Sequence, residues 1–354
     1  ERFHTSAMLR LVALLGLALA LAAWRRRRHT VRDALPREEL PRLLTVVVTT
    51  SPSPIHPSTE LIDALFASIA RYAAELLACR TIVVCDGYKV AKRVAFRSGK
   101  VDAAAAARYA EYKRHLRAAA AAGERFELLE LEENHGFGFA VRRALEEVRT
   151  PLVCVIQHDR TFLRTVALEP IARRMLLAAG AVGYVLLPTR STARYVHQQS
   201  SRLGAHGIKH ARGELERLAI PLHGEGESLG AEGGGRLLPC LQWYDSTHLA
   251  LTSYYREFVF NGAEKLVTQG KFIEAELGQV QFQEMCSKGI AASLPRWRTY
   301  LLDDVVEAPI VGHMNGSNGC AHEVLVSKCQ AEGIDPSKVM GRLGRTADNA
   351  RGSP

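Results

Sequence analysis

Runs of apolar and β-branched residues recur along the first half of the chain, and stretches with helical spacing separate them. The first run, residues 43–50 (LLTVVVTT), lacks polar alternation, as expected of a parallel strand buried on both faces. Residues 58–78 have amphipathic helical spacing, and residues 81–85 (TIVVC) form a second buried run. Further strand-like runs lie at 126–131 and 152–156. This alternation predicts an α/β fold, a Rossmann-like, mostly parallel sheet covered by helices.

Other segments have a different pattern. Residues 89–123 are rich in alanine and charge and predict a helical insertion between the second and third strands. Residues 200–236 are rich in glycine, charge and histidine, which is typical of either an active-site loop or a disordered segment. Strand-like pieces lie between 237 and 252, residues 272–288 predict a helix, and a short helix is expected near 321–331.

The amino-terminal segment is apolar and then strongly basic. Residues 8–24 (MLRLVALLGLALALAAW) contain one arginine, and four arginines follow at 25–28. The uninterrupted apolar part is shorter than the roughly 20 residues of a full span, and no small-residue cleavage site precedes the arginines. We therefore expect residues 1–28 to form a short membrane signal anchor and residues 29–42 a stem; the alternative is a buried hydrophobic helix.

The 354-residue chain carries a formal net charge of +9. A nucleic-acid-binding protein would concentrate this charge on one face with aromatic residues between the cations. Here the densest block lies beside an apolar stretch and the remaining cations are scattered, so we expect no nucleic-acid partner. An anionic membrane surface and a nucleotide diphosphate ligand account for the excess.

Polar residues follow the first two predicted strands, at the edge where open parallel sheets bind ligands. Thr49, Thr50 and Ser51 end the first strand and are able to contact a base or ribose. Asp86 follows the second strand and is placed to accept hydrogen bonds from the same nucleoside. The alternative for Asp86 is a simple Asp-Gly turn.

The third strand leads into Asn134 and Gly136, and a helical segment with Arg142 and Arg143 follows. The glycine permits a close backbone approach, and a helix amino terminus with two arginines complements a diphosphate. The alternative is an ordinary glycine-containing helix entry.

The fourth strand ends in Gln157, His158 and Asp159. A carboxylate at the tip of an apolar strand is costly unless it meets a cation or hydrogen-bond donors. Asp159 is therefore placed to hold a divalent metal, Mn²⁺ or Mg²⁺, that bridges two phosphates, with His158 beside the donor. The alternative is that Asp159 caps the next helix or pairs with Arg160.

The combination of these motifs resembles the family-2 glycosyltransferases of the GT-A fold. The resemblance covers residues 43–165 well and 240–300 loosely, and the matched positions are Asp86, Asn134 with Gly136 and Ala140, and Gln157-His158-Asp159. It implies a GT-A catalytic domain over residues 43–315, with a tail at 316–354. It also implies inverting transfer of a sugar from a UDP- or GDP-sugar donor to a hydroxyl of a glycan, protein or lipid acceptor.

The chain departs from the family pattern in three places. Gln157 replaces the first acid of the metal motif, the insertion at 89–123 is longer than the usual connection, and the late acidic motif is not cleanly present. Counting back from the glycine at 289, Glu276 falls within one position of the family's catalytic acid, with Glu274 as its neighbour. An inverting transfer needs such a carboxylate to deprotonate the acceptor, although both residues are equally explained as solvated helix charges.

Two further residues complete the candidate site. Asp245, within an aromatic and polar cluster from Trp243 to His248, is placed to bind acceptor hydroxyls or to act as the base. His313 resembles the carboxyl-terminal histidine that completes the metal site in some GT-A enzymes; otherwise it is a surface or core residue.

The resemblance favours a single-pass protein of a Golgi or secretory-pathway membrane, whereas the positive-inside rule would keep the arginine block and the following domain cytosolic. Two rival functions stay open. A degenerate GT-A domain that binds nucleotide or glycan as a scaffold is indicated by Gln157 and the unclear base. A nucleotidyltransferase would carry a glycine-rich basic loop after the first strand, where this chain has TTSPSP at 49–54.

Overall fold

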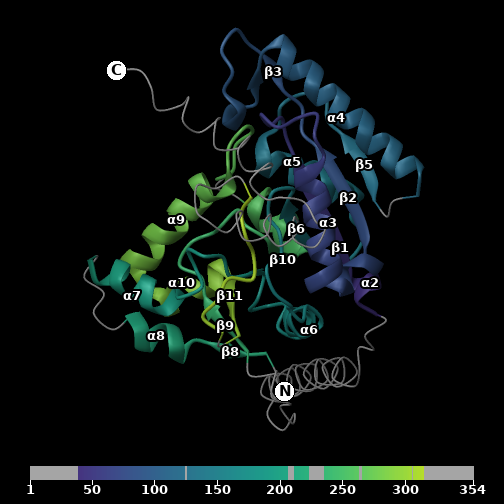
Figure 1. The fold of residues 1–354 in the computed structure, drawn as a ribbon. Coiled ribbons are helices and arrows are strands. Elements are labelled where there is room, and N and C mark those ends of the chain that lie inside the picture. The colour runs from purple at the N-terminus through teal and green to yellow at the C-terminus, as the bar shows by residue number, and fades with distance from the viewer. Residues whose placement is uncertain are drawn as a thin grey trace, which may run out of the picture.

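The computed structural model describes residues 39–123, 126–205, 211–222, 235–262, 265–304 and 306–314. Within these ranges, nine strands form a mixed sheet of order β5-β2-β1-β6-β10-β7-β11-β9-β8 (Figure 1). The strands are β1 (Leu44–Thr50), β2 (Arg80–Cys85), β5 (Glu127–Glu130), β6 (Leu152–Gln157), β7 (Tyr184–Leu186), β8 (Ile220–Pro221), β9 (Arg236–Pro239), β10 (His248–Leu251) and β11 (Thr299–Asp303). A separate pair is formed by β3 (Lys89–Val90) and β4 (Lys100–Val101).

The strand directions bring several chain segments to one edge of the sheet. β5, β2, β1 and β6 run parallel to one another, and β7 runs parallel to β11. β10 is antiparallel to both β6 and β7. The amino end of β10 at His248 therefore lies at the edge where β1, β2 and β6 end, and this carboxyl edge is where an open α/β sheet binds ligands.

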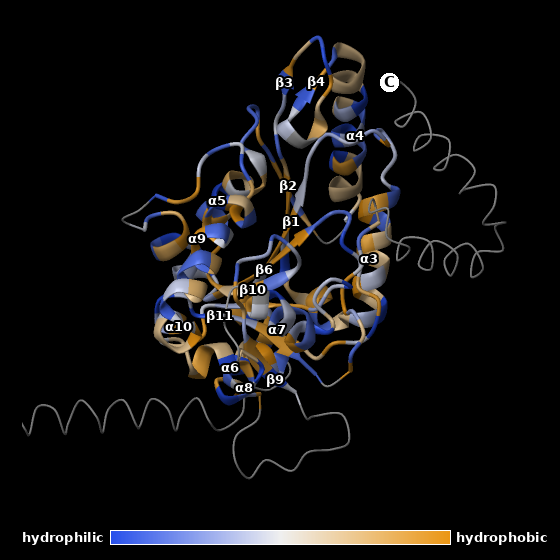
Figure 2. Cartoon of the chain, turned by 90° about the vertical axis from the view of Figure 1, so that its left-hand side faces the viewer, coloured by the Kyte–Doolittle hydropathy of each residue, from blue (hydrophilic) through white to orange (hydrophobic). Residues whose placement is uncertain are grey.

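Helices cover both faces of the central strands. Figure 2 shows α5 and α9 on one side of β1, β2 and β6 and α3 on the other. β1 is buried over its whole length, as its unbroken apolar pattern predicts. The helical elements are α2 (Leu40–Leu43), α3 (Glu60–Tyr72), η2 (Ala74–Ala78), η3 (Phe96–Ser98), α4 (Ala103–Ala121), α5 (Gly136–Glu147), α6 (Glu169–Leu177), α7 (Tyr195–Ala205), α8 (Ala211–Arg217), the π-helical η4 (Tyr254–Val259), α9 (Ile273–Lys288) and α10 (Ile290–Trp297).

The α/β class and the mostly parallel central sheet are confirmed. The four predicted strand runs coincide with β1, β2, β5 and β6, and the predicted helix at 272–288 is α9. The insertion between β2 and β5 contains the long helix α4, whose amino terminus is capped because the Asp102 carboxylate accepts a hydrogen bond from Ala105 N at 2.7 Å.

The prediction of a loop or disordered segment at 200–236 is wrong over part of its length. The second half of α7 falls in this range, as do all of α8 and β8. Buried Leu203, Ala211 and Leu215 fasten the two helices to the core, and the many polar residues around them hide this sparse apolar spacing. Residues 206–210 and 223–234 lie outside the described residues, as does the short helix expected near 321–331.

The expectation of a single-pass protein of the secretory-pathway membrane is contradicted. In the part of the chain that the structure describes, the helices include none with the length and apolar character that a bilayer crossing requires. Residues 1–28, predicted as the anchor, lie outside the described residues, with most of the predicted stem.

Candidate functional site

Two groups of polar side chains lie at the carboxyl edge of the sheet. The first, the β2 cluster, consists of Asp86, Gly87, Asn134, His135 and Gly136. The second, the β6 cluster, gathers polar residues at the tips of β6 and β10 and from two later segments: His158, Asp159, Arg160, Asp245, Ser246, Thr247, Glu274 and His313.

The Asp86 carboxylate accepts hydrogen bonds from every other member of the β2 cluster. Its Oδ1 accepts hydrogen bonds from Gly87 N at 2.9 Å and His135 N at 2.8 Å, and its Oδ2 accepts from Asn134 Nδ2 at 3.1 Å and Gly136 N at 2.9 Å. Burial raises the pKa of Asp86, and the backbone donors of His135 and Gly136 oppose that shift. A carboxylate accepts about four hydrogen bonds, so the protein itself fills its capacity.

Two glycines allow this tight arrangement. Gly136 has a φ of +72°, and a Cβ there would lie 2.6 Å from the Cα of Gly270. A Cβ at Gly99 would lie 2.1 Å from Asn134 Nδ2. A side chain at Gly136 would displace the backbone at Gly270, and one at Gly99 would displace the Asn134 side chain from its place in the β2 cluster. Asp86 therefore fixes the entry to α5, and its carboxylate, on a residue that is 3% exposed, is occupied by donors of the protein itself.

The insertion helix α4 covers the tips of β1 and β2. The Tyr109 hydroxyl donates to the carbonyl oxygen of Asp86 at 2.9 Å, and the Tyr112 hydroxyl lies 3.3 Å from Thr50 Oγ1. Both rings stack on His56, with centroids 5.0 and 4.1 Å away. Thr50 and its neighbour Thr49 are consequently buried, whereas Ser51 is exposed. The sequence offered one signal for this cover, the spacing that puts the two tyrosines on one helix face.

The predicted metal residues of the β6 cluster do lie together. His313 Nε2 is 3.0 Å from Asp159 Oδ2, although 154 residues separate them in the chain. Two backbone hydrogen bonds fix this approach, from Gly312 N to Thr161 O at 2.8 Å and from Met314 N to Asp159 O at 2.9 Å. Burial acts to raise the pKa of Asp159, but the hydrogen bond with His313 and the neighbouring positive charges outweigh it and lower the pKa to about 2.

Several buried polar atoms of the β6 cluster have no hydrogen-bond partner among the described residues. They are Asp159 Oδ1, His158 Nε2, Arg160 Nε, Ser246 Oγ and Thr247 Oγ1. The other ring nitrogen of His158 lies 3.3 Å from Thr49 O, and burial lowers the pKa of this histidine. Buried polar atoms in native proteins nearly always have partners, and the described residues place five atoms without one at two adjacent strand tips.

Asp159 and His313 fit a divalent cation that is shared with a diphosphate. Mg²⁺ typically takes one or two protein carboxylates and completes its shell with substrate phosphates and water. Across the described ranges, no group of three or more His, Cys, Asp or Glu side chains is arranged to hold a metal ion. The protein's own share of such a site is therefore Asp159 with its unfilled Oδ1 and His313.

A pair of carboxylates adjoins this position. Asp245 Oδ2 accepts from Glu274 N at 3.0 Å, the Glu274 carboxylate accepts from Asp245 N at 3.2 Å, and Trp243 Nε1 donates to Asp245 Oδ1 at 3.1 Å. Burial raises the pKa of Asp245 to about 7 and also raises that of Glu274. Burial lowers the pKa of Arg160, and the charges of Asp159, Glu274 and Asp245 oppose this, so the arginine lies near all three carboxylates.

The two glutamates predicted as bases are separated by the helix. Glu276 turns away from Asp245 and accepts hydrogen bonds from Thr268 N at 2.7 Å and Thr268 Oγ1 at 2.6 Å. Positions two apart on a helix point to nearly opposite faces, so only one of them faces the tip of β10. The structure brings Glu274 into the β6 cluster and leaves Glu276 outside it.

Three other predicted residues have local partners. The guanidinium of Arg142 lies over the ring of Phe139, 5.3 Å from its centroid, and Arg143 pairs with Glu146 one turn along α5. Both arginines are exposed on the second turn of α5. Gln157, which stands in the place of an acid, donates from Nε2 to the carbonyl oxygen of Asp245. That bond ties β6 to the segment before β10.

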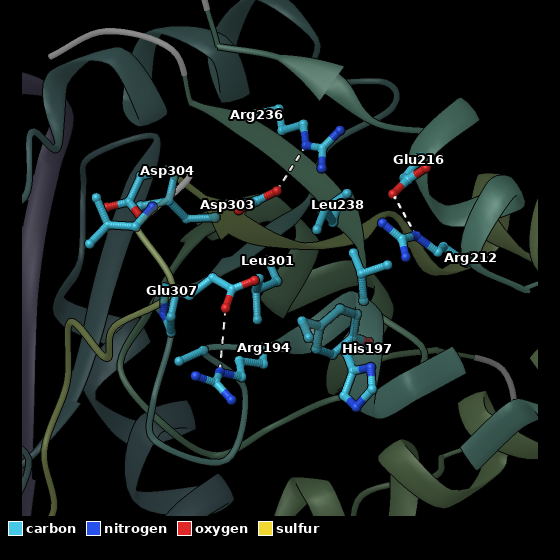
Figure 3. Close-up of a pocket in the computed structure, with 16 residues that line it drawn as sticks. Arg194, His197, Arg212, Glu216, Arg236, Leu238, Leu301, Asp303, Asp304 and Glu307 are labelled. Carbon is cyan, nitrogen blue, oxygen red and sulfur yellow. Dashed lines mark hydrogen bonds and ion pairs between the residues drawn. The ribbon is translucent and has the colours of Figure 1, made fainter. Parts of the chain in front are cut away.

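A separate cavity of about 440 Å³ lies where β7 and β11 end, lined also by α7, α8 and β9. Leu238 and Leu301 contribute its apolar lining, and Figure 3 shows Arg194 and Glu307 joined across it, with a nitrogen–oxygen distance of 3.4 Å. None of the predicted site residues lines this cavity. It was missed because its walls include α7 and α8, the helices that the sequence pattern concealed.

No family model matches the chain, and the search of curated proteins found no match. Among solved structures, the chain is similar to S. aureus TarS 1-349, at 13% identity and a TM-score of 0.37, over 80% of this chain and 63% of that one. The TarS complex with UDP-GlcNAc has 11% identity and a TM-score of 0.38, over 80% of this chain and 64% of that one. The mannosyltransferase from Pyrobaculum calidifontis in complex with GDP-Man and Mn²⁺ has 20% identity and a TM-score of 0.26, over 51% of this chain and 46% of that one.

The chain thus spans less than two thirds of the length of each of these structures. Both proteins have been solved with a nucleotide sugar, and the second is named a mannosyltransferase. The similarity transfers no residue role to this chain.

Proposed function

We propose that this chain is a glycosyltransferase that moves a sugar from a nucleotide diphosphate donor to an acceptor hydroxyl with inversion. The supporting observation is the β6 cluster: buried polar atoms without partners, beside two carboxylates whose pKa values burial raises. The cluster lies at the carboxyl edge of the parallel strands, where ligands of α/β sheets bind.

The donor diphosphate is assigned to the tips of β6 and β10. Arg160 and His158 supply nitrogen atoms there, and Ser246 and Thr247 supply hydroxyl donors for phosphate oxygens. Asp159 and His313 are the residues that would hold Mn²⁺ or Mg²⁺, which when bound would neutralise charge on the departing diphosphate. The β2 cluster fixes the amino terminus of α5, where the N–H groups of His135 and Gly136 donate to the Asp86 carboxylate.

Glu274 is the proposed base. Its carboxylate is partly exposed, whereas Asp245 is 4% exposed and accepts from Glu274 N at the start of α9. The acceptor oxygen forms the new bond to the anomeric carbon as its proton moves to Glu274. The bond from that carbon to the phosphate oxygen breaks at the same time, and its electron pair leaves with the nucleoside diphosphate. A pKa raised above the usual glutamate value suits a base that works near neutral pH. Asp245 is a positioning residue for it.

The acceptor's remaining part is assigned to the 440 Å³ cavity. α7 connects the cavity to the base. Arg194 and His197, near the beginning of α7, line the cavity, and Gln199 Nε2 donates to the hydroxyl of Tyr244 at 3.5 Å. Tyr244 directly precedes Asp245 in the chain. Paired cations and carboxylates around an apolar floor match the hydroxyl groups and carbon faces of a sugar.

A donor-hydrolysis assay with a panel of UDP- and GDP-sugars tests the proposal. We expect the wild-type chain to release nucleoside diphosphate from one of them and Asp159→Ala to lose this activity while it stays folded. If the wild-type chain shows no turnover and binds no nucleotide, the proposal is refuted.

The non-catalytic scaffold is the second candidate, and two observations favour it. Tyr109 and Tyr112 fill the space over the tips of β1 and β2, and the acid of the metal motif is replaced by Gln157, which is engaged within the protein. Binding of UDP or GDP without any hydrolysis or transfer across the donor panel would support the scaffold over the enzyme.

A further inference from the structure

Residues 88–102 form a projection that we call the basic finger. The finger leaves β2 directly after Asp86 and Gly87, pairs β3 with β4, and enters α4 at Asp102. Figure 2 places β3 and β4 at one end of the molecule beside α4, and Figure 1 shows β3 at the same end. Backbone hydrogen bonds from Lys89 N to Gly99 O at 2.7 Å and from Ala91 N to Val101 O at 2.8 Å close it.

The finger carries an uncompensated positive charge. In sequence it contains five cations, Lys89, Lys92, Arg93, Arg97 and Lys100, and a single acid, Asp102. The side chains of Lys89, Lys92, Arg93 and Lys100 are exposed, and no ion pair joins them to any residue that the structure describes. Asp102 is occupied as the cap of α4.

Acidic residues near the finger do not neutralise it. Glu111 on α4 pairs with Arg114 and His115, and Glu130 on β5 pairs with Lys113 and Arg117. The exposed Glu132 and Glu133 pass next to Gly87 without an ion pair to the finger within the described ranges. The later cations of α4, from Lys113 to Arg117, thus have carboxylate partners on the protein, while the four exposed cations of the finger have no ion pair among the described residues.

The finger packs against the β2 cluster. Val101, Ala105 and Ala106 form a small core, and Tyr88 and Phe96 pack on it. At its base, the Gly99 backbone lies directly against the Asn134 side chain, too close to admit a Cβ. The four exposed cations therefore extend from a backbone that is anchored beside the β2 cluster.

We propose that the basic finger docks a linear polyanion without bases, of the acidic polysaccharide type. Three of the four exposed cations are lysines, which act as flexible point charges suited to repeated anionic groups. The field of such a patch raises the local concentration of an anionic chain. This inference holds whether or not the chain transfers sugar.

Other anionic partners fit the finger less well. Single-stranded nucleic acid needs exposed aromatic rings for stacking, and Tyr88 and Phe96 pack inward. A bilayer surface favours an apolar face beside the cations, and Val90 is the one large apolar side chain that the described part of the finger exposes. A protein interface would be more apolar at its centre.

Fluorescence titration with heparin fragments of defined length tests the proposal, with uncharged dextran of equal length as the neutral probe. The finger variant Lys89→Gln/Lys92→Gln/Arg93→Gln removes three charges. The control variant Arg71→Gln/Arg217→Gln/Lys288→Gln removes three exposed charges from α3, α8 and α9. Exposed substitutions of this kind leave the fold intact, and circular dichroism checks both variants.

We expect the wild-type chain to bind heparin and not dextran. The finger variant should weaken binding at least ~10-fold. It should also lower the slope of log Kd against log salt by roughly 2, since each ionic contact that is lost no longer releases counterions. The control variant should stay within ~2-fold of wild type. Equal weakening by both variants, or none by the finger variant, would overturn the proposal. So would tighter finger-dependent binding to oligo(dT) or to vesicles with anionic lipid.

Discussion

The β2 cluster and the β6 cluster occupy the same edge of one sheet, and each centres on an aspartate that follows a buried strand. Asp86 has four donors on its two carboxylate oxygens, and a tyrosine from α4 covers its backbone. Asp159 has one partner on Oδ2 and none for its buried Oδ1 within the described residues. A strand-tip position therefore does not define a role. The number of unfilled hydrogen bonds distinguishes the two carboxylates, and on the proposed function the unfilled one is the ligand-binding group.

The largest expected effect is on activity at the β6 cluster. Asp159→Ala should lower the rate of sugar transfer or donor hydrolysis by about 1,000-fold, about 4 kcal/mol of transition-state stabilisation. Steady-state kinetics with the active donor measures this. Activity within 10-fold of wild type would remove Asp159 from the centre of the proposed mechanism.

The next effect is on stability at the β2 cluster. Asp86→Ala leaves the N–H groups of His135 and Gly136 and the Asn134 amide without their buried acceptor, which should destabilise the fold by about 3–5 kcal/mol. Urea unfolding measures this loss, with Asp159→Ala as the matched control expected to lose less. A larger loss at Asp159 than at Asp86 would reverse the comparison.

The two glutamates of α9 form a matched pair for the base. Glu274→Gln should lower kcat about 100-fold, as expected for loss of a general base, while Glu276→Gln stays within about 2-fold. Because burial raises the pKa of Glu274, kcat of the wild type should rise with pH through an inflection above the ordinary glutamate value and then level off. Equal losses in both variants would assign the effect to α9 stability instead.

The smallest effects come from two isosteric threonine substitutions. Thr50→Val removes a hydroxyl bonded to Tyr112 and should cost about 1 kcal/mol of stability without altering nucleotide affinity directly. Thr247→Val removes a buried hydroxyl without a partner in the described structure, so it should not destabilise the chain but should weaken UDP binding about 5-fold. Thermal unfolding and UDP titration of both variants test this contrast, and the opposite assignment of the two effects would contradict it.

Local patterns and one topological rule were enough to predict the framework of the site. The β-branched runs identify β1, β2 and β6, and the rule that parallel strands end at one edge brings Asp86 and Asp159 to that edge. The pairing of Asp159 with His313 was predicted from the resemblance, and the backbone bonds of Thr161 and Gly312 show how the late segment returns to β6.

The missed features depend on tertiary contacts. Glu276 was preferred to Glu274 by counting along the chain. The two residues point to nearly opposite faces of α9, so a count accurate to one position does not choose between them. Asp86 looked available because no sequence pattern reveals that Asn134, His135 and Gly136 occupy it. The cover by Tyr109 and Tyr112 requires knowing which way α4 packs, and the cavity at Arg194 requires the fold of α7 and α8.

Isothermal titration of UDP and GDP, each with Mn²⁺, into wild-type chain and Asp159→Ala tests the central claim most directly. If the β6 cluster is a diphosphate site, the wild type should bind one nucleotide with a Kd of about 10–100 μM, and the variant should bind at least ~30-fold more weakly. Equal affinities in the two proteins, or no binding of either nucleotide to the wild type, would contradict it.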